Sequence, residues 1–401
     1  MPSRVSAAIE VFVVALRLGL TSFGGPVAHL GYFREEYVRR RRWLDEATYA
    51  DLVALCQFLP GPASSQTGIA VGTLRAGLPG ALAAWLGFTL PSAIALVVFA
   101  YGIRGFDPSE AGWLHGLKVV AVAVVAQAVW GMARTLTPDR PRATLAALAT
   151  VAVVALPGAF VQVVVIAAAG VFGWLLFPTS AAAGDDRPVR VPIGRELAIA
   201  SLVLFGALLI ALPLAERATD WPTIAIVERF YRAGSLVFGG GHVVLPLLYA
   251  EVVTPGWVSD AAFVAGYGAA QAVPGPLFTF AAYLGAVMRV GPGGVAGAAI
   301  ALAAIFAPAF LLVIGALPFW DALRRNPAAQ GALTGVNAAV VGLLLAALYH
   351  PVWTSAIHAP ADFALALVAF VALAVWKLPA WLVVVASALA ASVVSFATAL
   401  P

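Results

Sequence analysis

The sequence predicts an all-α polytopic membrane protein made of two homologous repeats of inverted topology, each with broken or re-entrant helices. An apolar composition, duplicated glycine and proline motifs, and reversed loop charges support this prediction. Of the 401 residues, 62% are hydrophobic and 10% are charged, and the mean hydropathy is +0.96. Soluble domains carry about 25% charged residues. A composition this apolar therefore indicates a chain that lies in lipid.

Apolar stretches that could cross a bilayer recur along the chain, some of them counted with their flanks. They include Ala81–Ala100, Val119–Met132, Leu197–Leu214 and Phe363–Trp376. A β-barrel would show alternating segments of about ten residues instead. The net charge of +4 lies largely in short loops, where it indicates topology and not nucleic-acid binding. Because Cys56 is the single cysteine, we expect no disulfide framework, and we expect no metal centre or cofactor.

Two segments of the first half recur in the second half. LRLGLTSFGG (16–25) matches YRAGSLVFGG (231–240), and WLDEATYADLVALCQFLPGP (43–62) matches WVSDAAFVAGYGAAQAVPGP (257–276). We therefore predict an N-terminal repeat over 1–178, a linker with an extra transmembrane helix over 179–221, and a C-terminal repeat over 222–401. The matched positions pair Arg17 with Arg232, Gly19 with Gly234, Glu36 with Glu251, Trp43 with Trp257, Gln57 with Gln271, Gly116 with Gly335 and Lys118 with Asn337.

Loop charges predict that the repeats are inverted. Five arginines lie between Arg34 and Arg42, whereas the matching segment 249–257 has no lysine or arginine. The loops at 321–327 and 134–142 are basic, and their partners at 103–110 and 350–360 are not. By the positive-inside rule, matching loops face opposite sides of the membrane, and the extra helix near 197–214 supplies the odd crossing. This pattern predicts a cytoplasmic N-terminus and an external C-terminus.

The FGG and PGP motifs are predicted helix breaks that form a binding site. Such breaks free backbone polar groups, which lipid tolerates only where they line a cavity or are buried in protein. Paired breaks in inverted repeats point to a site near the membrane midplane, and helix N-termini there favour an anion. A simple packing kink is the alternative. The break residues expected to bind substrate are Phe23, Gly24, Gly25, Pro26, Pro60, Gly61, Pro62, Phe238, Gly239, Gly240, Gly241, Pro274, Gly275 and Pro276.

Arg17 and Arg232 are candidate charge partners of a bound anion, because each lies six residues before its FGG motif and charge within a membrane is costly. Alternatively, they reach the interface or pair with Glu10 and Glu228. Glu36 could couple protons or hold an arginine such as Arg39, and it could also simply lie in the charged loop.

Four further side chains are candidates for the site. Gln57 and Gln271 each precede a PGP motif by three residues, and could donate to an oxyanion or to a neighbouring helix. His29 and His242 lie near the FGG motifs, and could bind an anion, carry a proton or make a structural hydrogen bond.

The segments around these motifs resemble the chromate transporter family. The resemblance runs from SFGGPVAHLGYF to LPGPASSQTG in the first half and from FGGGHVVLPLLYAEV to AVPGPLFTFAAYLGA in the second, and it covers nearly the whole chain. It implies an efflux protein of the bacterial inner membrane that exports chromate and confers chromate resistance. It also implies that sulfate acts as an analogue or competitor.

We therefore expect a secondary transporter with chromate, sulfate and lipid as partners, and a homodimer stays open. Expelling a dianion from a negative cell interior is favourable by about 4.6 kcal/mol per 100 mV, twice the value for one charge. Potential-driven export, proton coupling and sulfate exchange all stay open. We do not expect an enzyme, because HExxH and GxSxG motifs are absent from the sequence. A channel and a transporter of another anion are the rival functions.

Overall fold

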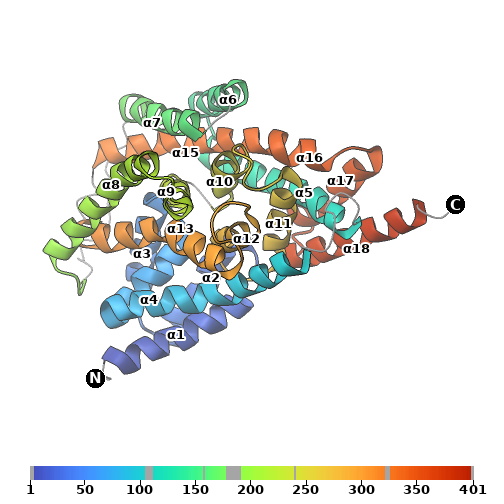
Figure 1. Ribbon diagram of the computed structural model, residues 1–401. Coiled ribbons are helices and arrows are strands. Elements are labelled where there is room, and N and C mark those ends of the chain that lie inside the picture. The colour runs from blue at the N-terminus through green and yellow to red at the C-terminus, as the bar shows by residue number, and fades with distance from the viewer. Residues whose placement is uncertain are drawn as a thin grey trace.

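The protein is a bundle of helices in which the two halves of the chain interlock. The computed structural model describes residues 4–103, 112–156, 159–177, 191–238, 241–320 and 326–398, and these ranges contain helices and turns but no strand. The all-helical prediction is confirmed. Figure 1 shows α1 and α4 along one side of the bundle and α6 and α7 along the other.

The first half contains α1 (Arg4–Thr21), α2 (Gly25–Phe33), the π-helical turn η1 (Arg34–Arg40), α3 (Glu46–Phe58), α4 (Ala63–Gly102), α5 (Gly112–Leu136), α6 (Arg140–Ala155) and α7 (Ala159–Leu176). The extra helix predicted near 197–214 forms α8 (Arg195–Ala218). The second half contains α9 (Pro222–Ser235), η3 (Gly241–Val243), α10 (Val244–Val252), α11 (Asp260–Ala272), η4 (Leu277–Thr279), α12 (Phe280–Val287), α13 (Gly294–Ala316), η5 (Leu317–Phe319), α15 (Pro327–Ala347), η6 (Leu348–Trp353), α16 (Thr354–Ala356), α17 (Pro360–Ala374) and α18 (Ala380–Thr398).

Helices end at the motifs that predicted breaks. In the first repeat α1 ends just before FGG, and α3 ends just before PGP. In the second repeat α9 and α11 end before the matching motifs. Gly24 and Gly25 adopt φ angles of 99° and 77°, which L-residues with a Cβ rarely adopt, so glycine is required at this break.

Each repeat also has a third break, which sequence reasoning missed. Ala76 and Gly77 leave helical geometry inside α4, and the arm before them folds back on the helix after them. A Cβ on Gly72 would lie 2.3 Å from the carbonyl oxygen of Gly80. In the second repeat the turn at 288–293 joins α12 to α13, and Gly285 approaches Gly297 equally closely. The folded arms are therefore held by glycine-to-glycine packing.

Five helical segments among the described residues are long and apolar enough to cross a membrane: Ala63–Gly102, Gly112–Leu136, Arg195–Ala218, Gly294–Phe319 and Pro327–Ala356. The remaining apolar helices are shorter, including the α17 segment that the sequence suggested as a span with its flanks. Only 11% of the most apolar window of α8 is buried, so this helix lies at the rim of the bundle.

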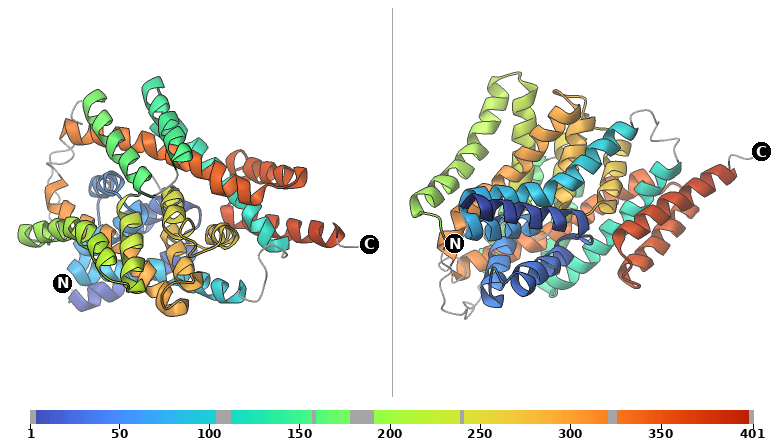
Figure 2. Two further views of the ribbon diagram at one scale, coloured as in Figure 1. Left: turned by 45° about the horizontal axis from the view of Figure 1, so that its top comes forward. Right: turned by 90° about the horizontal axis from the view of Figure 1, so that it is seen from below.

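The repeats exchange their last helices. Helix α5 of the first repeat packs against α17 and α18, and α15 of the second repeat packs against α6 and α7. Figures 1 and 2 show α6 and α7 beside α15. Matching glycines make both contacts close: a Cβ on Gly116 would meet the Ser387 carbonyl at 2.6 Å, and one on Gly335 would meet that of Ala169 at 2.0 Å. The described helices of the two halves thus intertwine in space.

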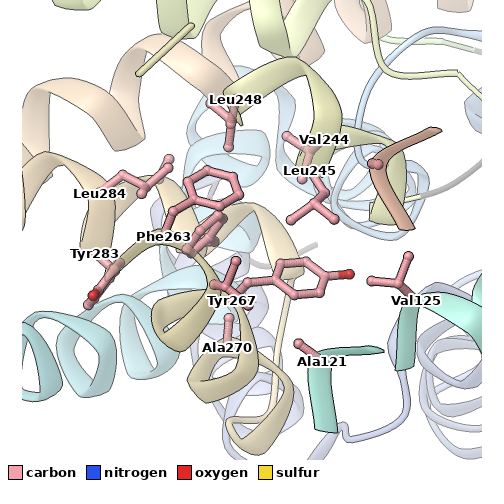
Figure 3. Packing of buried hydrophobic residues seen from close by; sticks show 14 of the residues in the cluster. Ala121, Val125, Val244, Leu245, Leu248, Phe263, Tyr267, Ala270, Tyr283 and Leu284 are labelled. Carbon is pink, nitrogen blue, oxygen red and sulfur yellow. The ribbon is translucent and has the colours of Figure 1, made fainter. Parts of the chain in front are cut away.

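Aromatic and aliphatic side chains of α10, α11 and α12 pack against α5 in the largest core cluster. Phe263 and Tyr267 lie at its centre and are fully buried. Figure 3 shows the Tyr267 hydroxyl pointing away from Phe263 and toward Val125 of α5. This rigid core fixes α11, whose last residues lead into the second PGP turn.

Candidate substrate-binding site

The four predicted breaks meet through a crossed pair of backbone hydrogen bonds. The N–H of Gly61 donates to the carbonyl of Val237 over 2.7 Å, and the N–H of Gly275 donates to the carbonyl of Ser22 over 2.9 Å. Ser22 and Val237 are matching positions, each directly before the phenylalanine of an FGG motif. Each PGP turn therefore binds the FGG break of the other repeat.

Two cavities of about 630 Å³ each open beside these breaks. Helix α2 separates them at its N-terminus, because Gly24, Gly25 and Pro26 line both. The remaining shared lining residues are Val124, Gln127 and His242. Gly24, the N-cap of α2, provides no side-chain cap and Pro26 has no N–H, so the N–H of Gly25 and those that follow Pro26 are the groups at this helix end that a ligand could contact.

The cavities differ in which repeat supplies the PGP turn. The first cavity is lined by Gln271 and Gly275 of the second repeat, with Phe23 and His29 from the first. The second cavity is lined by Gln57 and Gly61 of the first repeat, with Gly241 from the second. The matched glutamines thus lie in different cavities, as a pair of related half-sites would place them.

Several polar atoms around the cavities have no hydrogen-bond partner in the described part of the chain. They are Nε2 of His29 and Nε2 of Gln271 at the first cavity, and Oδ1 of Asn337 at the second. Leaving a buried polar group unsatisfied costs about 1–3 kcal/mol. These atoms are buried in this structure, so each would gain a hydrogen-bond partner if the cavity reshaped around a ligand or a water.

The two histidines are held by their other ring nitrogen. Nδ1 of His242 lies 2.6 Å from the hydroxyl of Tyr267, and Nδ1 of His29 lies 3.3 Å from the hydroxyl of Ser64. Both rings line a cavity, so the structural hydrogen bond and a role at the site are compatible.

The structure does not bring Arg17 and Arg232 to the cavities. The Arg17 side chain is exposed, and neither arginine is among the described residues that line the two cavities. Arg232 pairs with Glu228 at 2.8 Å and with Glu251 at 2.6 Å. This arrangement favours the pairing alternative for Arg232.

Charge pairs in the first repeat differ from those expected. Glu10 pairs with Arg41 and Arg75, each at 3.0 Å, and not with Arg17, the partner that the sequence suggested. Glu36 pairs with Arg41 at 2.7 Å and with Arg40 at 3.3 Å. Arg39, the suggested partner of Glu36, pairs with Glu35 instead, because those two residues lie one turn apart on η1.

The remaining predicted site residues have varied positions. Phe238 and the prolines of both PGP motifs shape the turns but do not line either cavity among the described residues. These prolines are Pro60, Pro62, Pro274 and Pro276. Gly239 and Gly240 lie outside the described residues, as do 178–190 of the linker and most of the loops at 103–110 and 321–327.

Lys377 is a cavity residue that sequence reasoning missed. It lies between α17 and α18, lines the first cavity and has a φ of 56°, a left-handed conformation that is uncommon for lysine. Apart from the histidines, it is the one ionisable cation among the described residues lining either cavity. Its occurrence as a lone charge in the apolar run AVWKLPAW was an available signal.

These features define a helical protein with several apolar candidate membrane spans and with paired helix breaks beside two cavities. The sequence model of the family described as "Chromate transporter" matches residues 9–174 and 224–392, and thus both halves. The chain belongs to the chromate transporter family.

Relatives with curated names span most of the chain. A chromate transport protein of Cupriavidus metallidurans is 28% identical over 345 residues, which is 84% of this chain and 81% of the relative. One of Pseudomonas aeruginosa is 29% identical over 343 residues, 84% of this chain and 79% of the relative. A probable chromate transport protein of Synechococcus elongatus is 25% identical over 382 residues, 94% of this chain and 92% of the relative. No solved structure matches the chain.

Proposed function

We propose that the protein is a secondary transporter of the bacterial inner membrane that exports chromate, with sulfate as a competing ligand. The membership of the family and the names of the relatives support the substrate. The crossed hydrogen bonds of Gly61 and Gly275 support an alternating-access mechanism, because they join helix breaks of both repeats between the two cavities. Alternating access then amounts to opening one cavity while the other closes.

The dianion binds at the N-terminus of α2 in this proposal. Uncapped N–H groups and the helix dipole stabilise negative charge there, and both cavities reach this point. In the first cavity the side-chain amide of Gln271 donates to an oxyanion, and Nε2 of His29 adds a donor in its protonated or Nε2–H form. Arg17 and Arg232 are not assigned to the substrate, given their positions.

Lys377 attracts the anion to the first cavity. Its ammonium lies at an exposed position on the lining, where it raises the local concentration of anions without holding them tightly. Weak holding suits transport, since a substrate that binds too strongly would not leave.

The loop charges predict the orientation of the protein, and the membrane potential supplies the energy for export. The arginine-rich segment between Arg34 and Arg42 supports a cytoplasmic N-terminus by the positive-inside rule, and inversion then predicts an external C-terminus. An interior that is negative drives out a dianion with about 4.6 kcal/mol per 100 mV. Export on this gradient needs no nucleotide.

Chromate flux into inside-out membrane vesicles tests the proposal. Under a potential positive in the lumen, we expect uptake that depends on the protein and falls when sulfate is added on the same side. Flux that is insensitive to potential but stimulated by sulfate on the opposite side would indicate exchange of dianions. If the protein adds no chromate flux to the vesicles, chromate is not its substrate. Flux that neither saturates with chromate nor exchanges labelled chromate would indicate a channel.

A further inference from the structure

A cluster of charged side chains joins the two helices that flank the FGG break of the second repeat. Arg232 of α9 donates to both carboxylate oxygens of Glu251 on α10, over 2.9 Å and 2.6 Å. Its Nη1 also lies 2.8 Å from Oε1 of Glu228, one turn earlier on α9. Arg229 pairs with Glu216 of α8 at 3.2 Å and donates to the carbonyl of Glu251 at 2.9 Å.

This cluster has one carboxylate too many. Three carboxylates, of Glu216, Glu228 and Glu251, face two guanidinium groups, so the cluster carries a formal charge of −1 when all are ionised. The side chain of Glu228 is only 1% exposed. Despite the nearby Nη1, neither of its oxygens accepts a hydrogen bond of acceptable geometry from the described part of the chain. A buried carboxylate with incomplete pairing is unfavourable, and a bound proton removes the excess charge.

The other elements packed against α9 carry further arginines, but none of them pairs with Glu228 in the described part of the chain. Helix α13 has no charged residue, α10 contributes Glu251, and α8 contributes Glu216 and the exposed Arg195 and Arg217. The turn at 288–293 approaches Ile226 through Gly291, and it carries Arg289. The backbone N–H of Arg289 donates to the carbonyl of Trp257, on whose ring Arg229 stacks, and the Arg289 guanidinium forms no ion pair with Glu228 in the described part of the chain.

The first repeat has no equivalent carboxylate. Val13 occupies the position that matches Glu228, and it is 57% exposed. Glu36, which matches Glu251, is paired with two arginines, Arg40 and Arg41. The excess negative charge is therefore particular to the second repeat, although the helix breaks are shared by both.

We propose that Glu228 is a proton-binding site whose occupancy is linked to that of the anion site. Helices α9 and α10 flank the segment that contains Val237, which accepts from Gly61, and His242, which lines both cavities. A dianion at this break makes the local potential more negative, so it favours protonation of Glu228. By linkage the proton favours the anion equally, and the two bind together. This coupling rests on the proposed function, whereas the proton site itself does not.

Infrared spectroscopy of the purified full-length protein tests the site without any transport. Acidification should produce the carbonyl stretch of a protonated, buried carboxyl group in the wild type. Glu228→Gln should lose this band, and Glu36→Gln, the matched control with a fully paired carboxylate, should keep it. Glu228→Asp should keep a titrating carboxyl whose band has a changed frequency, which guards against a glutamine variant that fails to fold.

The linkage is tested by repeating the titration with chromate. Chromate should move the midpoint of the Glu228 band to higher pH, and Glu228→Gln should carry chromate flux that no longer responds to a pH gradient at clamped potential. A band that survives in Glu228→Gln, or stays unchanged in Glu228→Asp, would overturn the proton site. A Glu228 band that chromate does not move, in a protein that transports chromate, would overturn the coupling alone. Absence of chromate flux with the band intact would instead count against the proposed function.

Discussion

The backbone N–H of Gly61 in the first repeat donates to the carbonyl oxygen of Val237 in the second, over 2.7 Å. The matching bond from Gly275 to Ser22 runs the other way, over 2.9 Å. A duplicated sequence alone does not require its copies to touch. Here each copy satisfies backbone groups that the other copy frees at its break, so neither break is complete without its partner. This mutual dependence keeps the four breaks together in an apolar surrounding.

Substituting either glycine by alanine should strongly reduce chromate transport. Gly61 and Gly275 have φ angles of 127° and 97°, which a residue with a Cβ adopts only with strain. A Cβ on Gly61 would meet the amide of Gln66 at 2.7 Å, and one on Gly275 would meet the hydroxyl of Ser92 at 2.8 Å. We expect flux in vesicles to fall by about tenfold or more for each variant, as a strain of about 1–2 kcal/mol would predict.

Gly31→Ala is the control for these variants. Gly31 lies on α2 near the same site, but a Cβ there would meet nothing within 4 Å. Its flux should equal that of the wild type at equal amounts of protein in the membrane. Full activity in Gly61→Ala and Gly275→Ala would show that the crossed bonds do not matter for transport.

Neutralising Lys377 should weaken recruitment of the anion to the first cavity. Two unit charges about 4 Å apart interact by about 1 kcal/mol in water, and a dianion doubles this value. Lys377→Gln should therefore raise the KM for chromate by about five- to thirtyfold and leave the maximal rate near that of the wild type. Lys377→Arg should retain most of the affinity, because it keeps the charge.

The dependence of KM on salt provides a second readout. The wild type should lose affinity as ionic strength rises, since salt screens exposed charges. The affinity of Lys377→Gln for chromate should fall less as the ionic strength rises. An equal salt dependence in both proteins would argue that Lys377 does not act through its charge.

The two glutamines should act from opposite faces of the membrane. Gln57 lines the second cavity and Gln271 the first, although they occupy matching positions. A hydrogen bond to a charged group contributes about 1.5–3 kcal/mol. Gln57→Leu and Gln271→Leu should each raise the apparent inhibition constant of sulfate by about tenfold, but on different sides of the vesicle membrane. Equal effects from the same side would contradict the prediction that the two cavities open to opposite faces of the membrane.

The sequence predicted the helix breaks because glycine and proline leave a local signature. FGG and PGP end helices at the expected positions, and the extra helix near 197–214 became α8. The fold-back at Gly77 was missed because its motif, LRAGLPG, differs from the matching MRVGPGG and was not recognised as part of the repeat. The exchange of helices between repeats could not be predicted, since no local preference specifies which repeat a helix packs against.

The site was harder to predict because side-chain direction decides it. Arg17 and Arg232 match in the sequence, yet Arg17 faces outward while Arg232 lies between two glutamates. Periodicity relative to a break does not reveal which face of a short helix meets the cavity. Lys377 enters from a helix connection about 350 positions after the first FGG motif, so only the tertiary fold brings it to the site.

The contact between α7 and α15 should limit stability more than any single site residue. Gly173 and Gly335 pack backbone to backbone, and a Cβ on Gly335 would lie 2.0 Å from the carbonyl oxygen of Ala169. Because a carbonyl in a packed helix cannot move aside as a flexible side chain can, Gly335→Ala must push the helices apart. Such overpacking costs about 1–3 kcal/mol. The temperature of half-maximal unfolding in detergent should fall by several degrees, and the matching Gly116→Ala should behave similarly.

Gly206→Ala on α8 is the control, because its new Cβ would meet nothing within 4 Å, and it should leave the unfolding temperature unchanged or raised. An unchanged temperature for Gly335→Ala would show that α7 and α15 are not held in close contact.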